Sequence, residues 1–215
     1  MIFDMDGVMV LTEEAHWVAW RRVSADHGVD LTRERFLDCF GQVNEDCIRT
    51  IFGAGVAAEL SQRIADEKEE AFRDAVRSSV PLAPGLRELL ETLRNSGVKT
   101  AVGSSAPVEN VDLILDESGI RGSFDAVIDG DQVANGKPAP DVFLRAAEAL
   151  ELPPEACLVI EDAPAGIRAA RAAGMVGVAV ATSHSAEELL SAGAVEVRNR
   201  LDEWRAEELL RAIAS

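Results

Sequence analysis

The chain from about residue 82 onward alternates short apolar runs with amphipathic segments. The apolar runs predict buried strands at 98–103, 125–129, 157–160 and 176–181. The segments between them have helical periodicity and predict helices at 86–97, 107–118, 140–150 and 165–173. Short strands that alternate with helices in this way predict a parallel α/β sheet that is covered on both faces.

Residues 12–81 follow a different pattern. They show helical periodicity over 13–27, 33–40, 45–52 and 57–77, with no convincing strand between these segments. Residues 1–3 form an apolar fragment that suits a central strand, and 204–213 reads as a closing amphipathic helix. We therefore predict a Rossmann-like parallel-sheet core, built discontinuously from 1–11 and 82–215. A small all-α domain, residues 12–81, is inserted after its first strand.

The composition is that of an ordinary globular protein, because 47% of the 215 residues are apolar and 27% are charged. No apolar run approaches the roughly 20 residues that cross a bilayer, and no basic-then-apolar leader is visible. The three cysteines, Cys39, Cys47 and Cys157, are an odd number without metal-type spacing. This pattern favours reduced thiols in a cytoplasmic protein over a disulfide.

The formal charge of -17 argues against nucleic acids and anionic membranes as partners, because both require a basic surface. An acidic enzyme that handles phosphate esters must also overcome repulsion from its substrate. A bound divalent cation and a positioned lysine would achieve this, and the chain has only Lys68, Lys99 and Lys137 to choose from.

Polar side chains follow the predicted strands at the positions where a parallel sheet forms its sites. These residues are Asp4 and Asp6 after the first strand, Ser104 and Ser105 after the next, Lys137 after the third, and Glu161 and Asp162 after the fourth. Carboxylates, a pair of hydroxyls and one lysine thus converge on a single edge of the sheet. Structural requirements alone do not explain such a combination.

The chemistry of this set points to phosphoryl transfer. Carboxylates that meet at one point repel one another unless a cation lies among them, and oxygen-only ligands at a phosphate site favour Mg²⁺. Asp4 is placed to attack as a nucleophile, while Asp6, two residues on, is placed to protonate the leaving alkoxide. Ser104 and Lys137 would bind the phosphoryl oxygens, where negative charge develops.

The segments DMDGV, GSS, GKPAPD and EDAPAG, in this order, resemble the haloacid dehalogenase superfamily of phosphohydrolases. The likeness is closest to the β-phosphoglucomutase-like branch and covers nearly the whole chain. One segment alone would be a weak signal, whereas the order and spacing of four are highly specific.

This resemblance implies a role for each residue at the sheet edge. It makes Asp4 the nucleophile and Asp6 the general acid/base. The Mg²⁺ ligands it implies are Asp4, the carbonyl oxygen of Asp6, Asp162 and Glu161. The phosphate-binding residues it implies are Ser104, Ser105 and Lys137. Two alternatives stay open: Glu161 could lie behind the direct ligands, and Ser105 could merely cap the following helix.

The likeness extends into the helical insert, which would be the cap that closes over the substrate. The segment VLTEEAHWVAW matches the hinge and first cap helix of the β-phosphoglucomutase-like proteins, and 40–46 matches their substrate-specificity loop. The substrate-contacting candidates are Thr12, Glu13, His16, Asn44 and Lys68. For two of them a structural alternative exists, since His16 could be an interior histidine and Lys68 lies in the charged run ADEKEEAFRD, typical of a solvated face.

One departure from the branch decides between two reactions. The mutase grips a second phosphate with an arginine in the cap loop, and Asn44 stands in its place here. Asparagine cannot replace that bidentate clamp. We therefore expect a Mg²⁺-dependent phosphatase for a small phosphorylated metabolite, with sugar phosphates preferred, acting as a monomer or weak homodimer. A β-phosphoglucomutase-type phosphomutase is the alternative.

Other function classes fit less well. Dehalogenase chemistry needs neither Mg²⁺ nor a proton donor such as Asp6. A phospho-accepting switch domain of the response-regulator kind has similar polar residues but is usually about half this length and lacks a cap. A catalytically silent binding protein would not need the intact set of residues.

Overall fold

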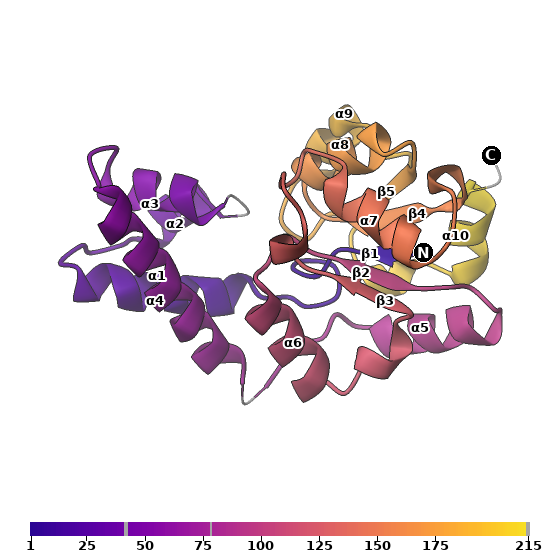
Figure 1. The fold of residues 1–215 in the computed structure, drawn as a ribbon, viewed down its shortest axis with the longest axis horizontal. Coiled ribbons are helices and arrows are strands. Elements are labelled where there is room, and N and C mark those ends of the chain that lie inside the picture. Colours follow the sequence, from indigo (N-terminus) through magenta and orange to yellow (C-terminus); the bar gives the residue numbers. More distant parts are fainter. Residues whose placement is uncertain (41–42, 78, 214–215) are drawn as a thin grey trace. The chain divides into compact units, whose positions relative to one another are not determined.

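A computed structural model describes residues 1–40, 43–77 and 79–213. The chain divides into two compact units, one made of Met1–Leu11 with Pro81–Ser215 and the other of Thr12–Val80. The predicted division lies one residue further along, at 81/82. Figure 1 shows the two units along the chain, with the helical one in indigo and purple.

The larger unit is built on a six-stranded sheet with the order β3-β2-β1-β4-β5-β6, in which every pair of neighbours is parallel. The strands are β1 (Ile2–Phe3), β2 (Ala101–Gly103), β3 (Ala126–Ile128), β4 (Leu158–Glu161), β5 (Val176–Val180) and β6 (Val197–Arg198). The strand order reverses beside β1, so the crevice at the carboxyl ends of β1 and β4 is the expected site of chemistry.

Helices cover both faces of this sheet, as predicted. They are α5 (Leu86–Asn95), α6 (Val108–Glu117), α7 (Asp141–Ala149), α8 (Pro164–Ala172), α9 (Ala186–Ala192) and α10 (Ala206–Ile213). Short 3-10 turns are η1 (Arg121–Ser123), η2 (Gly130–Gln132), η3 (Pro154–Ala156) and η4 (Leu201–Glu203). In Figure 1, α5 and α6 lie on one side of the strands, and α7, α8 and α9 lie on the other.

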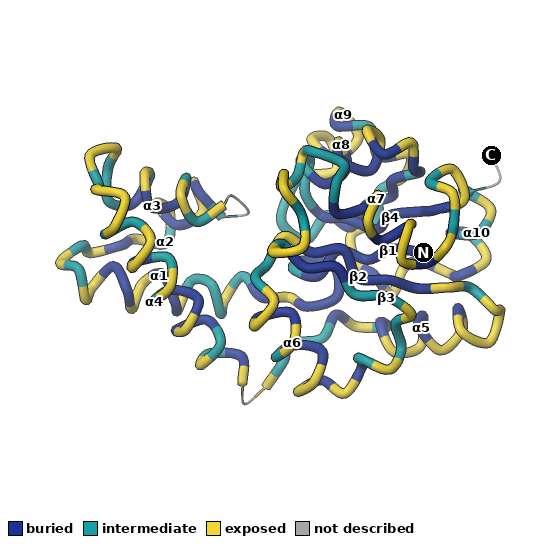
Figure 2. Tube along the Cα trace, viewed as in Figure 1, coloured by how far each residue is buried: buried dark blue, intermediate teal, exposed yellow. Residues whose placement is uncertain are grey.

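The two-residue strand β1 is the centre of this unit. Ile2 and Phe3 are fully buried, with β2 on one side and β4 on the other. Ile2 packs with Phe143 of α7, whereas the Phe3 ring meets Phe124 edge-on at 6.1 Å. Figure 2 shows β1, β2 and β4 as buried and the outer faces of α5 and α6 as exposed. The two side chains of this short strand therefore pack on opposite faces of the sheet.

The sequence patterns missed the last part of the sheet. They predicted no element between 181 and 204, where the structure has α9, β6 and η4. Strand β6 is only two residues long and half-buried at the edge of the sheet, so it carries no apolar run to signal it.

In the part that the structure describes, all secondary-structure elements of the smaller unit are helices. Its helices are α1 (Glu13–Asp26), α2 (Arg33–Leu37), α3 (Asn44–Phe52) and α4 (Ala58–Val76). Buried side chains such as Trp20, Phe36, Ile64 and Phe72 form its interior. Two residues of the predicted specificity loop 40–46, Gly41 and Gln42, lie outside the described residues.

Two further expectations concern cysteines and membranes. Cys39, Cys47 and Cys157 are buried and none forms a disulfide. In the portion of the chain with described coordinates, every helix falls short of the length or apolarity that crossing a bilayer demands.

Candidate active site

The carboxyl end of β1 places Asp4 at the point where the strand order of the sheet reverses. The Asp4 amide donates a hydrogen bond to the carbonyl oxygen of Ile160 at 3.0 Å, which fixes Asp4 beside the end of β4. Lys137 Nζ donates to Asp4 Oδ1 and, at 2.8 Å, to Glu161 Oε1. Three segments that are far apart in the sequence therefore meet at one point.

Lys137 is held in place by both charge and packing. Its side chain is nearly buried, and Nζ lies 4.8 Å from the centre of the Phe143 ring. Burial alone would lower the pKa of Lys137, but the Asp4 and Glu161 carboxylates raise it above its ordinary value. The lysine is therefore a fixed positive charge at this edge of the sheet.

Glu161, the last residue of β4, has partners on both carboxylate oxygens. Oε1 accepts from Lys137, while Oε2 accepts from the amides of Asp162 and Ala163, each at 2.8 Å. Gly166 in α8 lies so close that a Cβ there would collide with Oε1. The carboxylate thus locks the turn after β4 and orients Lys137.

Asp162 is contacted by hydroxyl groups from a loop that the sequence patterns did not single out. Ser183 Oγ donates to Asp162 Oδ2, and Thr182 Oγ1 lies 3.5 Å from the same oxygen. Thr182 Oγ1 also donates to the Gly7 carbonyl oxygen at 2.6 Å. Their place in the sequence could have identified these residues, because Thr182 and Ser183 follow β5 and so lie at the same carboxyl edge of the sheet.

Gly7 allows the chain to pass over Asp162. Its φ of 77° lies in the left-handed region, and a Cβ at this position would collide with Asp162 Oδ2. Only glycine combines this backbone conformation with such a close approach. The Asp-Gly turn after β1 and the acidic turn after β4 are therefore fitted to each other.

Asp4, Glu161 and Asp162 form a buried acidic cluster, since each offers one oxygen and these oxygens all lie within 4.8 Å of one another. Burial, with repulsion from neighbouring carboxylates, raises the pKa of Asp4 to about 7 against the opposing effect of Lys137. Burial and the Glu161 charge likewise raise the pKa of Asp162. One lysine does not neutralise three carboxylates, so the donor set fits a hard divalent cation.

The remaining predicted residues of this edge take different positions. Asp6 is half-buried, and its backbone bridges to Val10. Ser104 is buried at the end of β2, and its Oγ accepts from the Ala106 amide at 3.0 Å. Ser105 is exposed. The N-cap of α6 is Pro107, without a side-chain cap, so the capping alternative for Ser105 is wrong.

Within the helical unit, Lys68 is not solvated as its charged surroundings suggested. Its exposed fraction is 4%, its Nζ donates to Glu69 Oε1 at 2.8 Å, and it lies 5.6 Å from the centres of both the Trp20 and Phe72 rings. The apolar stem and the two rings bury the ammonium group, and Glu69 compensates its charge.

Two more sequence candidates join the same cluster. The His16 ring stacks on Phe72 with centroids 4.2 Å apart, and Asn44 Nδ2 donates to Glu69 Oε1 at 2.7 Å. Thr12 is buried, with its carbonyl oxygen accepting from the His16 amide at 2.9 Å. Glu13 pairs instead with Arg33. The cluster centres on Glu69, which sequence reasoning did not identify.

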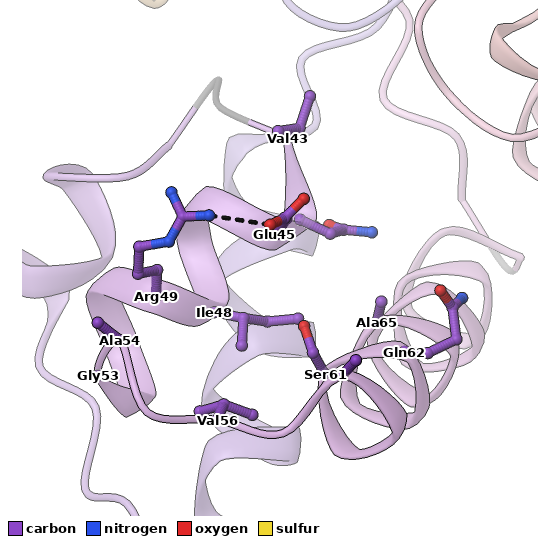
Figure 3. A pocket seen from close by; sticks show the side chains of 12 residues that line it. Val43, Glu45, Ile48, Arg49, Gly53, Ala54, Val56, Ser61, Gln62 and Ala65 are labelled. Carbon is purple, nitrogen blue, oxygen red and sulfur yellow. Dashed lines mark hydrogen bonds and ion pairs between the residues drawn. The ribbon is translucent and has the colours of Figure 1, made fainter.

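The helical unit also contains a cleft of about 670 Å³ between α3, the segment 53–57 and α4. Figure 3 shows Ile48, Val56 and Ala65 along its floor and walls. Arg49 at its rim is engaged by Glu45 at 2.9 Å. All residues that line the cleft belong to the helical unit, whereas those of the acidic cluster belong to the sheet unit.

Comparisons with known proteins agree with this arrangement. A sequence model of haloacid dehalogenase-like hydrolases matches residues 1–174. A phosphorylated carbohydrates phosphatase of Thermotoga maritima is 31% identical over 201 residues, which cover 91% of each chain. A beta-phosphoglucomutase of Bacillus subtilis is 35% identical over 187 residues, which cover 84% of this chain and 82% of that one.

A solved structure gives the same result for the fold. The crystal structure of a HAD hydrolase, family IA, variant 3, from Entamoeba histolytica has a TM-score of 0.91 at 25% identity. It covers 100% of this chain and 98% of its own. The resemblance in the sequence motifs is therefore confirmed, and the chain belongs to the haloacid dehalogenase-like hydrolases.

Proposed function

We propose that this hydrolase cleaves small phosphate monoesters, sugar phosphates foremost, through a phosphorylated Asp4. One observation carries the proposal. Lys137 donates to Asp4, which is 133 positions away in the sequence, and to Glu161, in a buried cluster completed by Asp162. A nucleophile, a fixed positive charge and an acidic metal site within hydrogen-bonding reach are what phosphoryl transfer requires.

The residues divide the reaction into two steps. An Asp4 oxygen attacks phosphorus, the bond to the leaving oxygen breaks, and Asp6 gives its proton to the alkoxide. Asp6 then takes a proton from water, whose oxygen attacks phosphorus and releases phosphate and the Asp4 carboxylate. Lys137 and the Ser104 hydroxyl bind the phosphoryl oxygens. The amide of Ala106 orients Ser104 by donating to its oxygen.

The acidic cluster fits the divalent metal ion that hydrolases of this family generally use, and we propose Mg²⁺. Asp4, the Asp6 carbonyl oxygen and Asp162 would hold it, with Glu161 either as a further ligand or as the group that orients Lys137. When bound, the ion supplies positive charge that screens Asp4 from an anionic substrate. The raised pKa values of Asp4 and Asp162 support a cation there, since it would relieve the same repulsion.

The contacts of Asn44 favour hydrolysis over mutase chemistry. Asn44 Nδ2 donates to Glu69 Oε1, so a carboxylate stands beside the position of the arginine expected in a mutase. The uncharged Asn44 amide gives a second phosphate no cationic clamp, which a mutase needs in order to retain its bisphosphate. The phosphatase name of the Thermotoga maritima relative supports the same choice. The Bacillus subtilis beta-phosphoglucomutase keeps the mutase as a second candidate.

We place substrate selection in the helical unit, as a cap, and reaction type in the sheet unit. The cap candidates are Thr12, Glu13, His16, Asn44 and Lys68. Exchanging 40–46 for the loop of a relative should change the substrate profile and leave the metal dependence intact. The buried, reduced cysteines support a cytoplasmic location.

Phosphate release from a panel of phosphorylated metabolites, measured with Mg²⁺ present, tests this function. We expect release from sugar monophosphates and no net isomerisation of a hexose 1-phosphate. Isomerisation without free phosphate would establish the mutase instead. The Asp4→Asn variant should lose turnover of para-nitrophenyl phosphate, and parental turnover by that variant would rule out the covalent route.

A further inference from the structure

The helical unit holds a pair of cysteines that the proposed reaction does not use. Cys39 follows α2 and Cys47 lies in α3, with exposed fractions of 0% and 3%. The Cys47 thiol donates to the Cys39 carbonyl oxygen at 3.0 Å, so its sulfur lies against the backbone of Cys39. The two cysteines are therefore neighbours in the folded chain.

The surroundings of the pair make its members unequal. Hydrogen bonding with the neighbouring Cys47 side chain lowers the pKa of Cys39, whose own thiol contacts the Phe36 carbonyl oxygen at 3.3 Å. Interaction with Cys39, together with burial, raises the pKa of Cys47. Because the thiolate is the nucleophile, Cys39 is the thiol that reacts first and Cys47 the one that resolves the product.

We propose that Cys39 and Cys47 are a redox modification site, at which a peroxide converts the two thiols into an intramolecular disulfide. Burial of both sulfurs favours an oxidant close to water in size over a bulky disulfide reagent. Hydrogen peroxide meets this requirement.

The chemistry balances with one peroxide for each pair. The Cys39 thiolate attacks a peroxide oxygen, so that an S–O bond forms, the O–O bond breaks and the leaving hydroxide becomes water with one proton. Cys47 then attacks the Cys39 sulfur, forming the S–S bond as the S–O bond breaks, and its proton leaves in a second water. Two thiols are oxidised and one peroxide is reduced to two waters.

The disulfide would close a ring of chain from Cys39 to Cys47. Its formation would tie the turn after α2 to helix α3. The inference concerns the thiols alone and does not depend on the proposed phosphatase activity.

Cys157 provides an internal control. It is also buried, with an exposed fraction of 0%, but it lies in the other unit, and its thiol contacts the Pro153 carbonyl oxygen at 3.7 Å. Burial raises the pKa of Cys157, and no neighbouring thiol lowers it. Cys157 should therefore react with peroxide more slowly than Cys39, at equal burial.

The test is limited oxidation of the full chain with hydrogen peroxide, followed by thiol blocking under denaturing conditions and peptide mapping without reductant. We expect Cys39 and Cys47 to form a disulfide-linked peptide pair at a rate at least tenfold higher than the rate at which the Cys157 thiol is lost. Dithiothreitol should reverse this link fully. The Cys47→Ser variant should give no linked pair.

Three results would overturn the inference. The first is retention of all three thiols under conditions that oxidise a linear peptide containing both cysteines. The second is loss of Cys157 at the same rate as the pair. The third is conversion of Cys39 to sulfinic acid without a linked product.

Discussion

The buried pair formed by Lys68 and Glu69 allows a sharp prediction about the stability of the helical unit. In the Glu69→Gln variant the shape is kept, and the new amide oxygen still accepts from Asn44 and Lys68. The variant loses the negative charge that compensates the Lys68 ammonium group, whose exposed fraction is 4%. The Trp20 and Phe72 rings stabilise the ammonium group in both proteins, so they do not offset the loss.

Removing one partner of a buried ion pair lowers the free energy of unfolding by about 3–5 kcal/mol, because a charge is left buried without compensation. With a urea m-value of about 1–3 kcal/mol/M, the unfolding midpoint should fall by at least ~1 M. Urea titration followed by far-UV circular dichroism measures the shift. Tryptophan fluorescence, to which Trp20 in the cluster contributes, should follow the same transition.

The matched control breaks an exposed pair that joins α1 to α4, the helix that carries Lys68 and Glu69. Arg22 in α1 and Asp74 in α4 are 3.3 Å apart, with side chains 61% and 54% exposed. The Asp74→Asn variant should therefore lose no more than about 1 kcal/mol. The double variant Lys68→Met/Glu69→Gln should recover most of the loss, since it removes both charges. If Glu69→Gln is as stable as Asp74→Asn, the reasoning about the buried pair is refuted.

Three further predictions concern the acidic edge. Gly7→Ala should weaken Mg²⁺ binding at least ~10-fold in a calorimetric titration, because its Cβ displaces Asp162. Gly97→Ala has a similar positive φ and open space around it, so it should leave the affinity unchanged. Lys137→Met should lower kcat for para-nitrophenyl phosphate by about 100- to 1,000-fold, whereas Lys99→Met, a half-exposed lysine, should match the parent. Chelation of divalent cations should lower kcat/KM by at least ~100-fold and added Mg²⁺ should restore it; undiminished activity in chelator would contradict the metal assignment.

The sequence was sufficient to predict the parallel sheet because alternation of apolar runs and helices is a local signal. It also placed Asp4, Lys137 and Asp162 at one edge, since the carboxyl ends of parallel strands share that edge. Strand β6 was not predicted because two half-buried edge residues produce no apolar run. An element that is too short to produce a recognisable pattern could not be predicted, wherever it lies in the chain.

The contacts of side chains were harder to predict than the elements that carry them. Lys68 reads as solvated within a charged run, yet the Trp20 ring, 48 positions earlier, helps to bury it. Ser183 reaches Asp162 from a loop after β5 that shows no motif. Both contacts depend on the packing of distant segments, which one-dimensional periodicity does not encode.

Trapping the intermediate is the most direct test of the central claim, that Asp4 attacks phosphorus. The enzyme is mixed with substrate and Mg²⁺, quenched in acid, reduced with borohydride and digested for mass spectrometry. We predict that the Asp4 carboxyl is reduced to the alcohol, because only an acyl phosphate there is reactive enough, and that enzyme without substrate is unchanged. Reduction at another residue, or none under conditions of active turnover, would contradict the account.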